Sequence, residues 1–143
     1  MKALVAKRAR ITRVRSVQHK LALTAAASAT AHVTTLESNA AKLATMRDSL
    51  TVAVGTTSGA ALQNRGELAQ RLDAARYGLT DAIVSARAAA ERKLAEKIEA
   101  RQRQESAARL DARAIQALAE WTETRMNAEF RPRGPRNIEQ GTD

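Results

Sequence analysis

The sequence predicts an all-α protein built as one long two-helix antiparallel coiled-coil hairpin. Three observations predict this fold class. The 143-residue chain is rich in alanine, leucine, arginine and glutamate, which are strong helix formers. Aromatic residues make up only 2% of the chain, so its side chains suit a narrow gap between helices better than a wide interior. Both prolines, Pro132 and Pro135, lie near the C-terminus, where they interrupt no earlier helix.

A first helix is predicted over about residues 4–53, because apolar side chains recur there at heptad spacing. These positions are Leu4, Ile11, Val14, Leu21, Ala25, Leu36, Ala40, Leu43 and Leu50. The step from Ala25 to Leu36 is eleven residues, which predicts a stutter that locally unwinds the supercoil.

The segment VGTTSGAA, residues 54–61, predicts the tip of the hairpin at residues 54–60. Two glycines bracket Thr-Thr-Ser, a pattern typical of a helix C-cap followed by the N-cap of the next helix. The segment lacks the Gly-Lys-Ser/Thr ending of a phosphate-binding loop, so nucleotide binding is not expected there.

A second helix is predicted over about residues 60–129, followed by a disordered tail over residues 131–143. Its heptad positions are Leu72, Leu79, Ile83, Leu94, Ile98, Ala108, Ile115 and Ala119. Ile83 and Leu94 are again eleven residues apart, which predicts a second stutter. The two stutters lie at the same height along the hairpin if the numbers of residues that face each other across it add to about 115. This alignment places Leu21 opposite Leu94.

In this alignment Leu4 pairs near Asp111, and the second helix overhangs the first by roughly twenty residues. The overhang carries an apolar stripe, formed by Ile115, Leu118, Trp121, Met126 and Phe130. An unpaired apolar stripe is typical of a docking surface. A packed third segment and a self-association surface are the alternatives.

Positive charge is concentrated at the N-terminus. The chain has a net charge of +9, and residues 1–20 hold seven basic residues and no acidic one. The densest run, KRARITRVR, contains Arg8, Arg10, Arg13 and Arg15. With the apolar positions in the contact between the helices, Arg8 and Arg15 are expected on one flank and Arg10 on the other. Nucleic acid, an anionic membrane surface and an acidic protein surface are the candidate partners, and no DNA- or RNA-binding motif accompanies the run.

Nothing in the sequence predicts an enzyme, a cofactor or a metal site. His19 and His32 are thirteen residues apart and share no metal-ligand spacing. Acidic and basic residues alternate at i,i+4 spacing in the second helix, which is typical of an exposed helix. The absence of cysteine fits a reducing compartment, and no apolar run approaches the ~18 residues of a membrane span. A targeting peptide is disfavoured because the helical pattern continues through the N-terminal segment.

The chain resembles the FliJ/YscO family, the stalk components of flagellar and related type III export ATPases. The resemblance is carried by ITRVRSVQHKLALTAAASATAHVTTLESNAAKLATMR, by the turn near the middle and by the closing helix ARLDARAIQALAEWTETRMNAEF. It covers nearly the whole chain, and it is a resemblance of pattern with no residue signature.

The resemblance implies a cytoplasmic, non-enzymatic stalk or chaperone beneath the export apparatus at the inner membrane. It implies that the open end of the hairpin contacts a hexameric ATPase ring, through Arg8, Arg10, Arg13, Arg15, Ile115, Leu118 and Trp121. It also implies a contact with the cytoplasmic domain of the export gate, through Leu72, Arg76, Leu79 and Ile83. The alternative is a nucleic-acid-associated or adaptor coiled coil that uses the same basic end.

Overall fold

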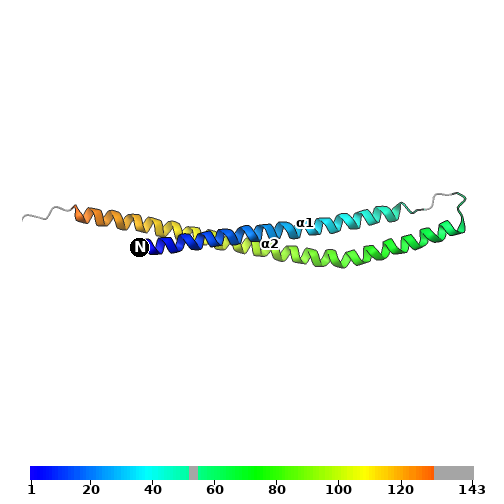
Figure 1. The fold of residues 1–143 in the computed structure, drawn as a ribbon, viewed down its shortest axis with the longest axis horizontal. Helices are drawn as coiled ribbons and strands as arrows, with labels where there is room; N and C mark the ends of the chain where they lie inside the picture. The colour runs from blue at the N-terminus through cyan, green and yellow to red at the C-terminus, as the bar shows by residue number, and fades with distance from the viewer. Residues whose placement is uncertain (52–54, 131–143) are drawn as a thin grey trace, which may run out of the picture.

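The fold is the predicted helical hairpin. A computed structural model describes residues 1–51 and 55–130, so the predicted tail and part of the predicted tip lie outside the described residues. Helix α1 (Lys2–Asp48) and helix α2 (Gly59–Glu129) run antiparallel and pack along each other to form a rod. At one end of the rod, α2 continues past the N-terminus (Figure 1).

Helix α1 ends at Asp48, five residues before its predicted end. Ser49 is its C-cap, and the Ser49 N–H donates to the Thr45 carbonyl at 3.0 Å. The predicted glycine C-cap near residue 55 is therefore wrong. The sequence after Leu50 explains the early end, since five of the next seven residues are β-branched and lose side-chain freedom in a helix.

Helix α2 begins as predicted and continues without a break for 71 residues. Ser58 is its N-cap, and its hydroxyl accepts a hydrogen bond from the Ala61 N–H at 3.2 Å. Gly78 lies in the interior of this helix and makes no close contact. A Cβ atom added there would meet nothing within 4 Å.

The two helices meet along positions that repeat every seven residues, which we call the contact face. On α1 these positions are Val5, Arg8, Thr12, Arg15, His19, Ala22, Ala26, Ala29, Val33, Leu36, Ala40, Leu43 and Arg47, and Leu50 continues the series just after the helix ends. On α2 they are Ala69, Leu72, Arg76, Leu79, Ile83, Ala86, Ala90, Lys93, Lys97, Ala100, Gln104, Ala107, Asp111, Ala114 and Leu118. Every one except Arg76 is half-buried or buried. The heptad spacing is unbroken on both helices, so the two predicted stutters are wrong.

Three contacts between the helices set their alignment. They join Arg8 to Leu110, Thr12 to Ala107, and Arg47 to Asp73. The residue numbers in these pairs add to 118, 119 and 120, so facing residues add to about 119 and not to the predicted 115. The Arg87–Glu37 ion pair lies beside the contact face, where two long side chains reach along the rod.

Alanine occupies the middle of the contact face and explains the unbroken repeat. Ala26, Ala86 and Ala90 lie in this middle section, and with Ala114 they are the buried apolar residues of the described chain. Small side chains let two helices approach closely, and a stutter at this level would disturb that contact. The heptad phase of Leu36 and Leu79 therefore continues through the alanines toward the N-terminus.

Because of this continuation, the larger apolar side chains at the predicted heptad positions toward the open end of the hairpin lie outside the contact. Leu4, Ile11, Val14, Leu21, Leu94, Ile98 and Ile115 are each between 42% and 66% exposed, where burial was predicted for the first six. On α1 each precedes a contact-face residue by one position, and on α2 each follows one. A shift of one position along a helix rotates a side chain by ~100° about the helix axis. Because the two helices are antiparallel, the residues that precede the contact face on α1 and those that follow it on α2 lie on opposite sides of the hairpin.

Two parts of the rod differ in the residues of their contact face. The tip half comprises residues 30–50 and 69–89, and the open half comprises residues 2–22 and 97–118. The contact face of the tip half is mainly leucine, isoleucine and alanine, whereas that of the open half contains arginine, threonine, histidine, lysine, glutamine and aspartate.

Candidate partner-binding surfaces

Polar groups bridge the two helices in the open half. Arg8 Nη1 donates to the Leu110 carbonyl at 3.3 Å, and the Thr12 hydroxyl lies 3.4 Å from the Ala107 carbonyl. Asp111 Oδ1 is buried and has no hydrogen-bond partner within the described part of the chain. A contact of this kind is weaker than an apolar one, because polar groups leave water to form it.

The four arginines of the basic run fall into two pairs. Arg8 and Arg15 lie in the contact face and are half-buried, so their predicted place on the flank is wrong. Arg15 Nη1 donates to Gln18 Oε1 at 2.9 Å. Arg10 and Arg13 are exposed on the outer side of α1. The structure thus brings the arginines to one end of the rod but not to one surface.

A groove of about 720 Å³ runs along one side of the open half, between α1 and α2. Its apolar wall includes Leu4 and Ile11 from α1 and Leu110 from α2. Its charged residues are Lys7, Arg8, Arg15, Arg103 and Glu99. Four basic groups and one acidic group give this groove a net charge of +3, and Arg103 pairs with Glu99 along the helix.

Beyond Leu118, helix α2 has no partner on α1, and we call residues 119–130 the overhang. Because facing residue numbers add to about 119 and not to 115, the overhang is about half as long as predicted. Leu118 is half-buried at its base, and Ile115 lies below it beside the contact face. Trp121 is 44% exposed, and the Arg125 guanidinium lies over its ring at 5.5 Å from the centroid.

The charge of the overhang is opposite to that of the groove. Its acidic residues are Glu120, Glu123 and Glu129, and its basic residue is Arg125, which gives a net charge of −2. Arg125 Nε donates to Glu129 Oε1 at 3.4 Å. The excess of basic residues at the N-terminus therefore stands beside an acidic helical extension.

The residues implied for an export-gate contact lie in the tip half. Leu72, Leu79 and Ile83 are half-buried in the contact face against α1, and Arg76 is exposed. A hollow of about 450 Å³ lies beside them, lined by Ala40, Asp73, Arg76, Tyr77, Thr80 and Ile83.

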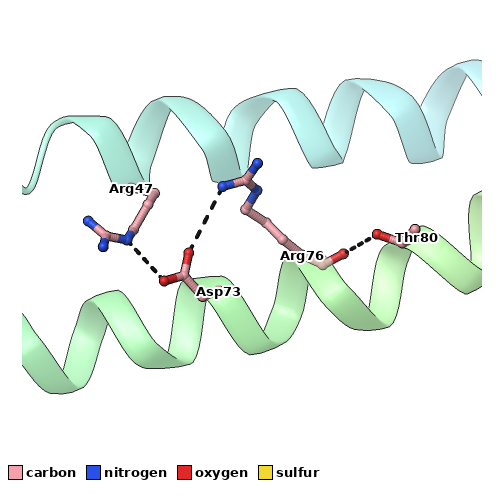
Figure 2. Close-up of polar contacts among 4 residues, drawn as sticks. All are labelled: Arg47, Asp73, Arg76 and Thr80. Atoms are coloured by element: carbon pink, nitrogen blue, oxygen red, sulfur yellow. Dashed lines mark hydrogen bonds and ion pairs between the residues drawn. The ribbon is translucent and has the colours of Figure 1, made fainter.

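An acidic side chain organises the charges at this hollow. Figure 2 shows Asp73 between two arginines from different helices. Asp73 Oδ2 accepts from Arg47 Nε at 3.2 Å, and Asp73 Oδ1 lies 3.9 Å from Arg76 Nη1. The Thr80 hydroxyl donates to the Arg76 carbonyl at 3.1 Å, a bond within α2. Arg76, Tyr77 and Ile83 line the hollow, whereas Leu72 and Leu79 lie in the contact face and do not line it.

Sequence reasoning missed the groove, because it placed Leu4 and Ile11 between the helices. It also gave no role to Leu110 or Arg103, which lie on the second helix near the level of Ile11. The alanine-rich middle favours an unbroken heptad only once the alignment of the tip half is known, so the sequence alone gave no signal for the groove.

The two histidines remain apart in the structure, where His19 is half-buried in the contact face and His32 is exposed. No cluster of three potential metal ligands occurs within residues 1–51 and 55–130. Across the same residues, neither helix has an apolar stretch that would cross a membrane. Comparison of the chain with protein-family models, with curated proteins and with solved structures returned no match.

Proposed function

We propose that this protein is a non-enzymatic coiled-coil stalk of the flagellar or a related type III export apparatus, which bridges the ATPase ring and the export gate. The observation that supports this function best is the form of the rod. An antiparallel hairpin with a free helical extension at the end that carries its N-terminus (Figure 1) suits a part that enters a ring at that end.

In this proposal the open end contacts the ring through two kinds of group. Arg10 and Arg13 are exposed and attract an acidic surface, an effect that raises the association rate and weakens with salt. Trp121 supplies a buried anchor once the ring surrounds the overhang, since aromatic residues dominate binding hot spots. Leu118 and Ile115 extend the apolar surface from its base.

The gate contact is proposed at the hollow of the tip half. Arg76, Tyr77 and Thr80 are its exposed members, and Ile83 lines it from the contact face. A partner at this site therefore meets polar groups first, and Leu72 and Leu79 act by holding α2 against α1.

The test is co-purification with a hexameric export ATPase and stimulation of its ATP hydrolysis. We expect Trp121→Ala, and separately the reversal of Arg8, Arg10, Arg13 and Arg15 to glutamate, to reduce both readouts at least about tenfold. Tyr77→Ala is the matched aromatic control, since Tyr77 is exposed in the tip half. Reversal of Lys42, Arg65, Arg71 and Arg92, all exposed, is the matched charge control. If the open-end variants behave as the wild type does, the stalk function is wrong.

A nucleic-acid-associated coiled coil is the second candidate, and one observation favours it. Arg10, Arg13 and Lys20 are all exposed on the outer part of α1, where they can contact phosphates. A gel shift of duplex DNA or RNA titrated with salt distinguishes the two functions. Micromolar binding with a steep salt dependence that Arg10→Glu and Arg13→Glu abolish supports nucleic acid over the ATPase ring.

A further inference from the structure

The overhang is an amphipathic helix that packs against no other segment among residues 1–51 and 55–130. Trp121, Met126 and Phe130 are 44%, 54% and 84% exposed, and they follow the last contact-face residue, Leu118. The same helical segment has a net charge of −2. An apolar and acidic helix of this kind fits an apolar and basic groove.

The groove of the open half has these complementary properties. Leu4, Ile11 and Leu110 are between 44% and 47% exposed in it, and its charged residues add to +3. Its length also matches. The overhang runs for about 16 Å from residue 119 to residue 129, and the groove runs for about 16 Å along α1 from Leu4 to Arg15.

An overhang cannot reach the groove of its own chain. It continues helix α2 straight past the N-terminus, away from the open half (Figure 1). A bend back would break hydrogen bonds in the middle of a continuous helix. The occupant that these observations indicate is therefore the overhang of a second copy.

We propose that two copies of the chain associate head to head through their open ends, each placing its overhang in the groove of the other. The centre of the groove lies near residue 105 of α2, and the centre of the overhang lies near residue 124. When the two α2 helices run antiparallel, with residue 105 of each copy opposite residue 124 of the other, both contacts between an overhang and a groove form at once. Such an interface is two-fold symmetric and closed, so assembly stops at the dimer.

This dimer does not rest on the proposed stalk function, but it bears on it. Trp121 is used in both, so a dimer withholds its open ends from a ring. A ring that binds the open end would then have to displace the second copy. The assays are separate, since self-association is measured without any ATPase.

Self-association is measured by sedimentation equilibrium, which reports mass independently of the elongated shape, from about 1 to 200 µM chain in 50 mM salt. We expect twice the chain mass of 15.4 kDa, with a Kd on the order of 10 µM because the interface is small. Raising the salt to 500 mM is expected to raise this Kd at least about fivefold. A chain that stays monomeric across this range overturns the proposal, and so does growth beyond the dimer.

A charge exchange tests which surfaces meet. Arg103→Glu in the groove and Glu123→Arg in the overhang each place like charges together, so each variant alone is expected to raise the Kd at least about tenfold. Mixing the two single variants restores both contacts in a heterodimer, and the double variant restores the homodimer. Arg92→Glu, an exposed change on α2 outside the groove, is the charge control. Failure of the mixture to associate while both single variants remain helical overturns the proposed pairing.

A matched pair of substitutions at apolar residues tests which side of the hairpin the overhang of the second copy contacts. Ile11→Glu alters the groove, and Ile98→Glu makes the same change in the open half at a residue outside the groove. We expect the first to raise the dimer Kd at least about tenfold and the second to change it less than about twofold. Circular dichroism at 222 nm checks that both variants keep their helix content. Equal effects from the two variants overturn the assignment of the groove.

Discussion

The tip half and the open half of this rod share one heptad repeat but differ in what fills it. In the tip half, Leu36 and Leu43 on α1 meet Leu79 and Ile83 on α2, and Arg47 and Arg76 are the charged residues of the contact face. In the open half the corresponding positions hold Arg8, Thr12, Arg15 and His19, together with polar residues of α2. The larger apolar residues of that half lie one position away, outside the contact.

This difference shows how one part of a coiled coil sets the phase of another. The tip half and the alanine section, the middle of the rod that contains Ala26, Ala86 and Ala90, bury apolar surface with an unbroken heptad repeat. Because the two helices are rigid, the same heptad phase continues into the open half. The open half then follows a phase that its own apolar residues do not favour. Stability is concentrated where the pattern and the contact agree, and exposed apolar surface remains where they disagree.

The largest expected effect lies in the alanine section. Ala26 is 2% exposed, so Ala26→Leu forces the helices apart and is expected to lower the free energy of unfolding by about 1–3 kcal/mol. Ala27→Leu, an exposed change on the next residue, is the control and is expected to shift it by less than about 0.5 kcal/mol. Urea unfolding followed by circular dichroism measures both. Equal stability of the two variants would contradict the close contact at Ala26.

The next effect compares one leucine from each half. Leu36 is half-buried in the tip half, and Leu36→Ala is expected to cost about 1–2 kcal/mol, part of the cost at a fully buried site. Leu21 is 66% exposed in the open half, and Leu21→Ala is expected to cost less than about 0.5 kcal/mol. The comparison uses the same substitution and the same urea titration. A reversed order would mean that the open half holds the apolar contact.

A smaller effect of opposite sign is expected from the contact face of the open half. Arg15→Leu places an apolar side chain where an arginine is now half-buried, and it is expected to stabilise the hairpin by about 0.5–1 kcal/mol. Arg10→Leu removes the same charge from an exposed position and is expected to change little. The difference in melting temperature between the two variants measures the effect. A destabilising Arg15→Leu would place Arg15 outside the contact face.

The smallest effect concerns the charge cluster of the tip half. The side chains of Arg47, Asp73 and Arg76 are between 36% and 47% exposed, so water and salt screen their ion pairs. We expect Asp73→Asn to cost about 0.5 kcal/mol in 20 mM salt and almost nothing in 500 mM salt. A cost that stays constant with salt would indicate a packing role for Asp73.

Composition and local patterns were sufficient to predict the hairpin, an N-cap at the tip and the end of α2. Alanine-rich helices without internal proline specify length and continuity, and Ser58 caps a helix by its own chemistry. The placement of Leu72, Leu79 and Ile83 in the contact was also predicted, because large apolar residues there keep a regular repeat.

The open half could not be predicted from its own residues. Heptad analysis follows the large apolar side chains, and at Leu4, Ile11 and Ile98 these do not form the contact. The deciding interaction is the close approach of alanines in the middle of the rod, outside the open half, which gives almost no signal in a hydrophobic pattern. The groove and the shorter overhang both depend on that alignment, so they emerge only from the folded chain.

The alignment of the open half is the central claim, and site-specific disulfide formation tests it most directly. The chain has no cysteine, so a pair of introduced cysteines has no background. Thr12→Cys with Ala107→Cys joins residues that face each other in the structure, and Leu21→Cys with Leu94→Cys joins residues that face each other only when the numbers add to 115. We expect mild oxidation of dilute protein to close the first pair rapidly and to leave the second open. Rapid closure of the second pair with none of the first would contradict the account.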